Sequence, residues 1–410
     1  MWKYLLCIIV SNRRMVSLQE RFMNKITKTI PEIESSYDYV FGYLEEQKPF
    51  SPQMINFAVS NYEISLRKDS IINFLSQLFS FKPKEKTRYI FIGRKYRDLL
   101  RGLPREDVLV IGSWKDWLYC LWHRIPFRLG LPVMKAALDC YAANKLTLIP
   151  ETQEILKCGT DSDPKFVILY NDSLPVERIY CLLAMSLGIY SVCIQHGVFQ
   201  ANSPARIYDG GVADLMLAFD KHQYELMADG GVPKEKLGIV GFHSNIERYD
   251  NLSNGLARRV CILGQPWAGY YPEIEEQYYA LLEDISAILS KSGYTFVFKP
   301  HPNERSAHYF GKYGVVESAK LKECLARYDV FISFTSTALI EASLAGRVAI
   351  QIFDPVFIAD RFSDFGYAHS VDSNDLSHLS KLVSEALPIH IDYSGTINTR
   401  FQAAIRSHSF

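Results

Sequence analysis

The apolar run Phe296-Val-Phe298 stops at Lys299-Pro300-His301-Pro302. The run predicts a buried strand, and the two prolines end its ladder because proline has no backbone N–H to donate. A cation and an imidazole therefore follow the carboxyl end of a strand, where open α/β sheets bind ligands. His301 can donate to a phosphate oxygen on which charge develops, with Lys299 as a supporting charge. The alternative is a proline turn with a solvated histidine and an edge lysine.

A turn rich in hydroxyl groups, Thr335–Thr337, follows the apolar run at 330–333 and precedes a helix that starts at Ala338. Hydroxyls and the first amides of a helix together can bind an anion. Capping a helix needs only one hydroxyl, either Ser336 or Thr337, so three of them favour contact with phosphate. Glu341, about one turn further, can accept from ribose hydroxyls or take a packing role. Gln265 follows the run at 260–263 and can flank the same site.

Gln195-His196-Gly197 ends another apolar run, at 191–194. A histidine with a pKa near neutrality can take a proton from an acceptor hydroxyl, which makes His196 a candidate general base. Asp172 follows the preceding strand, and it can orient His196 or act as the base itself. The alternatives are a loop histidine bonded to backbone, and an aspartate that caps a helix starting near 175.

These motifs need a scaffold in which strands and helices alternate, and the chain predicts one from residue 88 onward. Alternation of this kind is typical of parallel sheets joined by right-handed crossovers. We expect residues 115–150 to be mostly helical and 374–387 to form the final helix. The predicted strands lie at 89–92, 108–111, 166–170, 191–195, 215–219, 237–240, 260–263, 295–298, 315–316, 330–333 and 348–352.

The chain has 410 residues, enough for two domains of ordinary size. A stretch rich in Pro, Gly and Asn near 241–258 predicts the boundary between them. We expect an N-terminal Rossmann-like acceptor domain at 1–245 with a helical insertion at about 15–84. A Rossmann-like nucleotide-donor domain at 258–390 and a tail at 391–410 follow. The predicted fold class is α/β, with two doubly wound domains that face each other across a cleft.

Composition excludes several classes of function. Lys and Arg number 45, as do Asp and Glu, so no overall field attracts nucleic acid. The eight cysteines form no Cys-x-x-Cys pair, which indicates buried thiols in a reducing cytoplasm.

The apolar start at 1–10 predicts a buried strand, because no small-residue cleavage site follows it. The stretch 114–128, with its Trp and Arg residues, can touch lipid at the inner face of the membrane or pack as a helix.

The His-Pro element at 299–302, the hydroxyl turn that leads into Ala338–Gly346, and Gln195-His196-Gly197 together resemble bacterial GT-B glycosyltransferases of surface polysaccharide synthesis. The resemblance covers roughly 165–372. It extends to CMP-sialic acid and CMP-Kdo transferases and to teichoic-acid-type polyol-phosphate transferases, which use a His-Gly element as base. It implies that His301 and Thr335–Thr337 hold the donor phosphate. His-Gly stands here where the sialyltransferase pattern has an acidic pair.

The resemblance implies a metal-independent glycosyltransferase without a cofactor. It would move a sugar from a nucleotide-activated donor, with a CMP-sugar favoured, to an oligosaccharide or lipid-linked surface glycan. A polyol-phosphate transferase with a CDP-polyol donor and a nucleotide-sugar epimerase of the same build are the alternatives. A non-catalytic scaffold is a further one, which failure to bind any nucleotide would favour.

Overall fold

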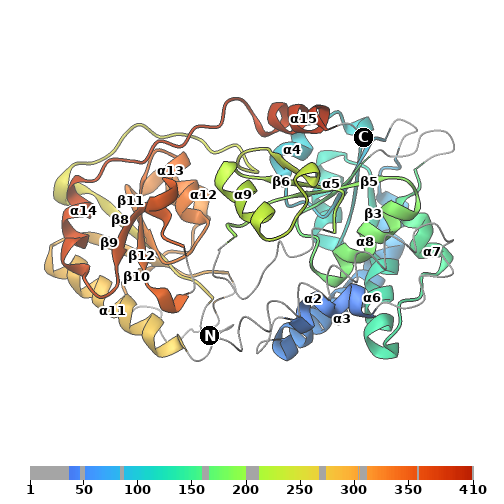
Figure 1. The fold of residues 1–410 in the computed structure, drawn as a ribbon, viewed down its shortest axis with the longest axis horizontal. Helices are drawn as coiled ribbons and strands as arrows, with labels where there is room; N and C mark the ends of the chain where they lie inside the picture. Colours follow the sequence, from blue (N-terminus) through green and yellow to red (C-terminus); the bar gives the residue numbers. More distant parts are fainter. Residues whose placement is uncertain are drawn as a thin grey trace. The chain divides into compact units, whose positions relative to one another are not determined.

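The computed structural model describes residues 37–46, 51–83, 87–158, 166–199, 212–266, 274–302, 304, 312–357 and 360–408 (Figure 1). The predicted strand at 1–10 and the start of the helical insertion lie outside them. The described residues divide into two compact units. The first takes its residues from Met1–His196, Arg206–His243 and Phe401–Phe410, and the second takes its own from Gly197–Ala205 and Ser244–Arg400.

The described part of the first unit contains a seven-stranded parallel sheet in the order β3-β2-β1-β4-β5-β6-β7. Every residue of β1, β4 and β6 is buried, which is why these strands read as continuous apolar runs rather than as alternating ones. The strands are β1 (Tyr89–Ile92), β2 (Val108–Gly112), β3 (Phe127–Leu129), β4 (Phe166–Leu169), β5 (Tyr190–Ile194), β6 (Leu215–Ala218) and β7 (Leu237–Ile239).

Helices connect these strands and add a layer from the N-terminal region. The α-helices are α2 (Tyr37–Glu46), α3 (Ser51–Phe79), α4 (Arg97–Gly102), α5 (Trp114–His123), α6 (Leu131–Ala143), α7 (Pro150–Gln153), α8 (Pro175–Ser186) and α9 (Lys221–Asp229). Helix α8 starts with Pro175, whose missing N–H would have no partner at that position. Helices α2 and α3 pack on α6, α2 also packs on α8, and α3 also packs on α5 and β3. The helical insertion of the prediction thus contributes to the first unit.

The described part of the second unit contains a six-stranded parallel sheet in the order β10-β9-β8-β11-β12-β13. Its strands are β8 (Arg259–Leu263), β9 (Thr295–Lys299), β10 (Val315–Val316), β11 (Val330–Ser333), β12 (Val348–Phe353) and β13 (His369–Asp372). Its α-helices are α11 (Glu275–Lys291), α12 (Leu321–Arg327), α13 (Ala338–Leu344), α14 (Leu379–Glu385) and the beginning of α15 (Ile397–Ser407).

Helices cover both faces of the second sheet, with α11 and α14 on one face and α12 and α13 on the other (Figure 1). One apolar core joins α11 and α14 to the sheet, through residues such as Leu282, Leu379 and Ile350 that have no exposed surface. The seven cysteines of the described part are buried free thiols. No helix in the described ranges is both long and apolar enough to cross a membrane.

Four elements differ from the sequence prediction. Strand β3 lies inside the region expected to be helical, because it is a three-residue edge strand between Pro126 and Gly130 that leaves little periodic signal. Strand β13 was not predicted, since His369-Ser-Val-Asp372 is a polar edge strand. The predicted final helix at 374–387 is the shorter α14, and the predicted tail at 391–410 contains α15.

Candidate functional site

The carboxyl ends of β8 and β11 form the topological switch point of the second unit. The chain leaves β8 toward β9 and β10 and leaves β11 toward β12 and β13, so the two following loops diverge. Loops that diverge in this way open a crevice in which doubly wound sheets bind ligands. Gln265 follows β8 and Thr335 follows β11, so the sequence prediction placed both residues at this point.

Gln265 and Thr335 join these two loops by a reciprocal pair of hydrogen bonds. Gln265 Nε2 donates to Thr335 Oγ1 over 2.8 Å, and the Thr335 amide donates to Gln265 Oε1 over 2.8 Å. The Gln265 amide in turn donates to the Tyr278 hydroxyl over 2.8 Å. Gln265 is 7% exposed, so its amide group is held in one orientation. The turn that follows β11 therefore has a fixed backbone position.

Each hydroxyl of the turn accepts a hydrogen bond from an N–H group of the protein. Thr335 Oγ1 accepts from Gln265, Ser336 Oγ from the Ala338 amide over 3.2 Å, and Thr337 Oγ1 from the Val198 amide over 3.2 Å. A hydroxyl that accepts in this way still carries a proton to donate. The turn thus presents three O–H donors at the carboxyl end of β11, and such donors suit an anion better than a cation. Of the three hydroxyls, only that of Ser336 accepts from an amide of the following helix, which is what the capping alternative predicted for Ser336 or Thr337.

Glu304, which stands next to the His-Pro element in the sequence, adds a titratable group to this site for which the sequence alone suggested no role. Burial raises its pKa to about 7, although the hydrogen bonds from the His301 amide and the Tyr278 hydroxyl oppose the rise. Those bonds are 2.9 Å to Oε2 and 3.2 Å to Oε1. The carboxyl lies over Gly264, where a Cβ atom would be 2.2 Å from Oε2. The sequence shows a carboxylate three residues after His301, but only the fold reveals that this carboxylate is buried.

The other predicted residues of the second unit lie around this centre. His301 follows β9, one strand beyond β8, so its backbone is about 10 Å from the end of β11 at the usual strand spacing. Its amide belongs to a chain of hydrogen bonds that runs through Glu304, Tyr278 and Gln265 to Thr335.

The two remaining predicted residues, Lys299 and Glu341, make backbone contacts outside the two loops of the switch point. Lys299 Nζ donates to the Ala319 carbonyl oxygen over 2.5 Å. Its ammonium group is therefore engaged by the loop before α12. Glu341 lies half-buried in the first turn of α13, where its carbonyl accepts from the Ala345 amide over 2.9 Å. Their roles toward phosphate and ribose stay predictions.

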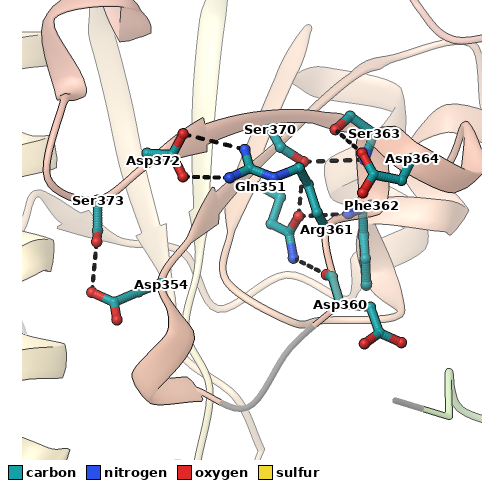
Figure 2. A network of polar contacts seen from close by, with 10 residues as sticks. All are labelled: Gln351, Asp354, Asp360, Arg361, Phe362, Ser363, Asp364, Ser370, Asp372 and Ser373. Carbon is teal, nitrogen blue, oxygen red and sulfur yellow. Dashed lines mark hydrogen bonds and ion pairs between the residues drawn. The ribbon is translucent and has the colours of Figure 1, made fainter. Parts of the chain in front are cut away.

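The polar network drawn in Figure 2 joins β12 to residues 360–364 and to β13. Gln351, within β12, accepts from the Phe362 amide and the Ser370 hydroxyl, each over 2.8 Å, and donates to the Asp360 carbonyl over 2.9 Å. Arg361 pairs with Asp372 at 2.5 Å. A carboxylate thus matches the guanidinium charge of Arg361 at this edge of the sheet.

His196 lies at the carboxyl end of β5 in the first unit. Its Nδ1 is 2.5 Å from the Tyr170 carbonyl oxygen, and because a carbonyl only accepts, Nδ1 carries the proton. Nε2 is then the acceptor nitrogen that a general base needs. Burial, aided by the charge of Lys95, lowers the pKa of His196 to about 4, so the ring is neutral at pH 7 but is a weaker base than the near-neutral imidazole that the sequence predicted. The alternative interpretation, a loop histidine bonded to backbone, is thus also met. The same bond selects the ring tautomer that a general base needs.

Asp172 is 2% exposed. It bonds to backbone amides of a distant segment and does not cap the helix that follows it. Its Oδ2 accepts from the Val212 amide over 2.8 Å and from the Ala213 amide over 3.1 Å. The residue that accepts amides before α8 is instead Asn171, from Ser173 over 2.6 Å. Both bonds tie this carboxylate to the backbone of the segment before β6. Of the two predicted bases, His196 has the more suitable contacts.

Glu177, in the first turn of α8, is a second acid that the sequence reading passed over. It is 5% exposed, and burial raises its pKa to about 7 despite a hydrogen bond from the Tyr170 side chain. Within the described part of the chain, its Oε2 has no hydrogen-bond partner. A buried carboxyl near half-ionisation is a candidate for proton transfer or for strain. The sequence showed it only as one polar residue in a predicted helix.

Comparisons with known proteins found solved structures with a similar fold. No family model matches the sequence, and no curated protein matches it. The structure of MnaA from S. aureus with UDP is 12% identical, with a TM-score of 0.50, and the match covers 79% of this chain and 96% of that one. The UDP-GlcNAc 2-epimerase of Methanocaldococcus jannaschii, in complex with UDP-GlcNAc and UDP, is 14% identical, with a TM-score of 0.51, over 78% and 99% of the two chains.

The chain therefore has an α/β fold of GT-B-like type, with two Rossmann-like units, and the predicted fold class is confirmed at that level. At these identities the likeness concerns the fold alone. The closer resemblance to CMP-sugar transferases stays a prediction.

Proposed function

We propose that this protein is an enzyme that acts on a nucleotide-activated sugar and holds the nucleotide phosphates at the switch point of its second unit. The observation that carries the proposal is the hydroxyl turn Thr335–Thr337, whose three oxygens already accept N–H bonds and keep their protons for an anion. Its place at the diverging ends of β8 and β11 supports the assignment, because such sites bind nucleotides in open α/β sheets.

A uridine diphosphate sugar is the first donor to consider. Both similar structures are described with UDP, and a diphosphate can reach from the end of β11 toward His301. Strand ends two positions apart are separated by about 10 Å, which one phosphate alone would not span. This choice replaces the CMP-sugar favoured by the sequence. CMP-, CDP- and GDP-linked compounds are the comparison ligands.

Epimerisation of the sugar is the reaction we favour. Inverting one carbon requires a proton to leave on one face and return on the other, which needs groups with pKa values near the working pH. Glu304, which hydrogen bonds link to the hydroxyl turn through Tyr278 and Gln265, has a pKa of about 7. The sequence alone showed no strong set of such groups, and the name of the similar structure from M. jannaschii agrees with this reaction.

Incubation of the protein with UDP-GlcNAc in D2O, without any acceptor, tests the reaction. An epimerase incorporates deuterium at the inverted carbon of the recovered nucleotide sugar, as proton NMR would show. A glycosyltransferase leaves the donor unlabelled until an acceptor is added. Turnover that depends strictly on a glycan acceptor would overturn the epimerase assignment and favour the transferase.

A variant of the turn tests the binding site separately. Thr337→Val keeps the shape of the side chain and removes one O–H donor, and we expect the affinity for UDP-GlcNAc to fall about tenfold or more, the cost of one charged hydrogen bond. Thr295→Val makes the same exchange at the exposed amino end of β9 and should leave the affinity unchanged. Equal affinities in both variants, measured by calorimetry, would contradict the phosphate site.

Glycosyl transfer is the second candidate, and one observation in the first unit favours it. The neutral His196 ring, with Nδ1 bonded to the Tyr170 carbonyl oxygen, turns its acceptor nitrogen away from the backbone. That is the arrangement of a base that takes a proton from an acceptor hydroxyl. His196→Asn would then abolish transfer while leaving the affinity for the nucleotide intact.

A further inference from the structure

Exposed apolar side chains gather on one part of the first unit. Among the described residues, sixteen large apolar side chains are exposed, and eight of them lie between Ile64 and Trp122. Single exposed side chains of this kind are ordinary on soluble proteins, but a concentration marks an interaction surface. The α3–α5 patch, as we call it, consists of Leu75, Leu78, Phe79, Phe81, Leu118, Leu121 and Trp122.

The members of the α3–α5 patch come from elements that pack together. Helix α3 contacts both α5 and β3, and the Trp114 amide at the start of α5 donates to Asp69 Oδ1 in α3 over 2.9 Å. Phe81, just after α3, pairs with Pro126, which follows α5. The two helices and the segment after α3 that carry the patch are therefore neighbours.

Helical spacing directs the apolar side chains of each helix outward together. Leu118 and Trp122 are four residues apart in α5, and Leu75 and Phe79 are four apart in α3, so each pair lies on one helix face. Trp122 is 85% exposed and Leu78 is 60% exposed. A tryptophan exposed to this extent, beside aliphatic neighbours, is typical of a side chain that meets the interface of a membrane.

Basic residues lie close in the chain to members of the patch. Lys82, Lys115 and Arg124 are exposed at its edges. On the adjoining face of α5, Arg94 and Arg97 lie 5.7 and 5.6 Å from the centre of the Tyr119 ring.

The acidic groups nearest to this edge are already paired. Asp116 pairs with Arg94 at 3.2 Å, and Asp98 pairs with Arg101 at 2.5 Å. Burial, together with Arg101, Arg105 and Arg97, lowers the pKa of His123, which indicates a positive local field. Because the chain as a whole has no net charge, this field is a local feature.

We propose that the α3–α5 patch docks the protein on the surface of an anionic lipid bilayer. Trp122, Leu118, Leu78 and Phe79 would enter the zone between headgroups and acyl chains, while the basic rim meets lipid phosphates. Apolar insertion and electrostatic attraction add in this mode of binding, which is why both a hydrophobic patch and a basic rim are expected. The patch contains no residue of the switch point in the second unit, so this docking does not depend on the proposed function.

Sedimentation of the full-length protein with vesicles tests the docking. We expect binding to vesicles that contain phosphatidylglycerol, weaker binding to pure phosphatidylcholine, and a loss of binding as salt rises. The double variant Leu118→Ser/Trp122→Ser should bind at least tenfold more weakly. Leu256→Ser/Leu387→Ser is the matched control, since these side chains are 64% and 71% exposed in the second unit, and it should bind as the wild type does.

Affinity for UDP-GlcNAc, measured on the same variants, confirms that they are folded and separates this proposal from the proposed function. Equal vesicle binding by the wild type and the Leu118→Ser/Trp122→Ser variant would overturn the docking. Wild-type protein that stays in the supernatant with anionic vesicles would also overturn it. So would a wild-type dimer that the patch variant converts to a monomer, because the patch would then be covered by a second copy.

Discussion

Glu304 combines a raised pKa with a position beside the hydroxyl turn. Burial holds the pKa near 7, so the group changes charge within the physiological range. When protonated it can donate to a phosphate oxygen, and when ionised it repels one. A single carboxyl can therefore make the affinity of the site depend on pH.

We expect the affinity for UDP-GlcNAc to fall severalfold between pH 6 and pH 8, as Glu304 loses its proton. Both phosphates of this ligand are diesters, so its own charge stays constant over that range. Glu304→Gln, which keeps the size and cannot ionise, should show a flat profile when calorimetry is repeated at each pH. A variant that follows the wild-type curve would assign the dependence to another group.

At the scale of elements, the loop after β8 works because residue 264 has no side chain. A Cβ atom there would lie 2.2 Å from Glu304 Oε2 and 2.9 Å from Phe298 Cζ, so the carboxyl and the ring would both have to move. Gly197 offers a contrast, since the nearest atom to its Cβ position is Thr337 Oγ1, at 3.8 Å. Neither glycine has a left-handed backbone, so the comparison depends on space alone.

Gly264→Ala should lower the free energy of unfolding by about 1–3 kcal/mol, as overpacking does, and should weaken binding of UDP-GlcNAc. Gly197→Ala should change the stability little, because its Cβ atom makes an ordinary contact. Thermal unfolding of both variants measures the difference. Similar melting temperatures for the two variants would show that the loop after β8 can adjust without cost.

Elements buried on both faces could be predicted from the sequence, because each leaves an uninterrupted apolar run, as β4 and β11 do. The edge strands β3 and β13 could not, since β3 has only three residues and β13 needs few apolar ones, whereas the edge strands β7 and β10 were predicted. Helix α15 was predictable in principle, because Ile397, Phe401 and Ile405 are buried at helical spacing. The hydroxyl turn was found because its chemistry is local. The bonds of Asp172 to residues 40 and 41 positions away depend on the fold, and no local pattern contains them.

At the scale of the whole molecule, buried acids make stability depend on pH. The pKa of Glu177 rises from 4.5 to about 7 on folding, so the native state holds a proton that the unfolded state releases. Because the native state binds more protons between these two values, stability falls as pH rises from 4.5 to 7 and is lowest above 7.

Glu177→Gln removes this ionisation from both states. Relative to the wild type, the variant should gain up to about 3 kcal/mol between pH 4.5 and pH 8, since each pH unit of the difference contributes about 1.4 kcal/mol. Urea unfolding at both pH values measures the change. Glu385→Gln, at an exposed position of α14, is the control and should keep a constant difference from the wild type. A constant difference for Glu177→Gln as well would contradict the buried acid.

The grouping of residues 197–199 with the second unit limits how the protein can be dissected. A fragment that spans only residues 244–400 would contain the switch point but would lack the Val198 amide that donates to Thr337. Its hydroxyl would then be open to rotate, and the isolated half would offer nucleotide a less ordered turn than the intact chain does. A faithful minimal version of the nucleotide half therefore has to carry this short piece from upstream, by a linker or by circular permutation.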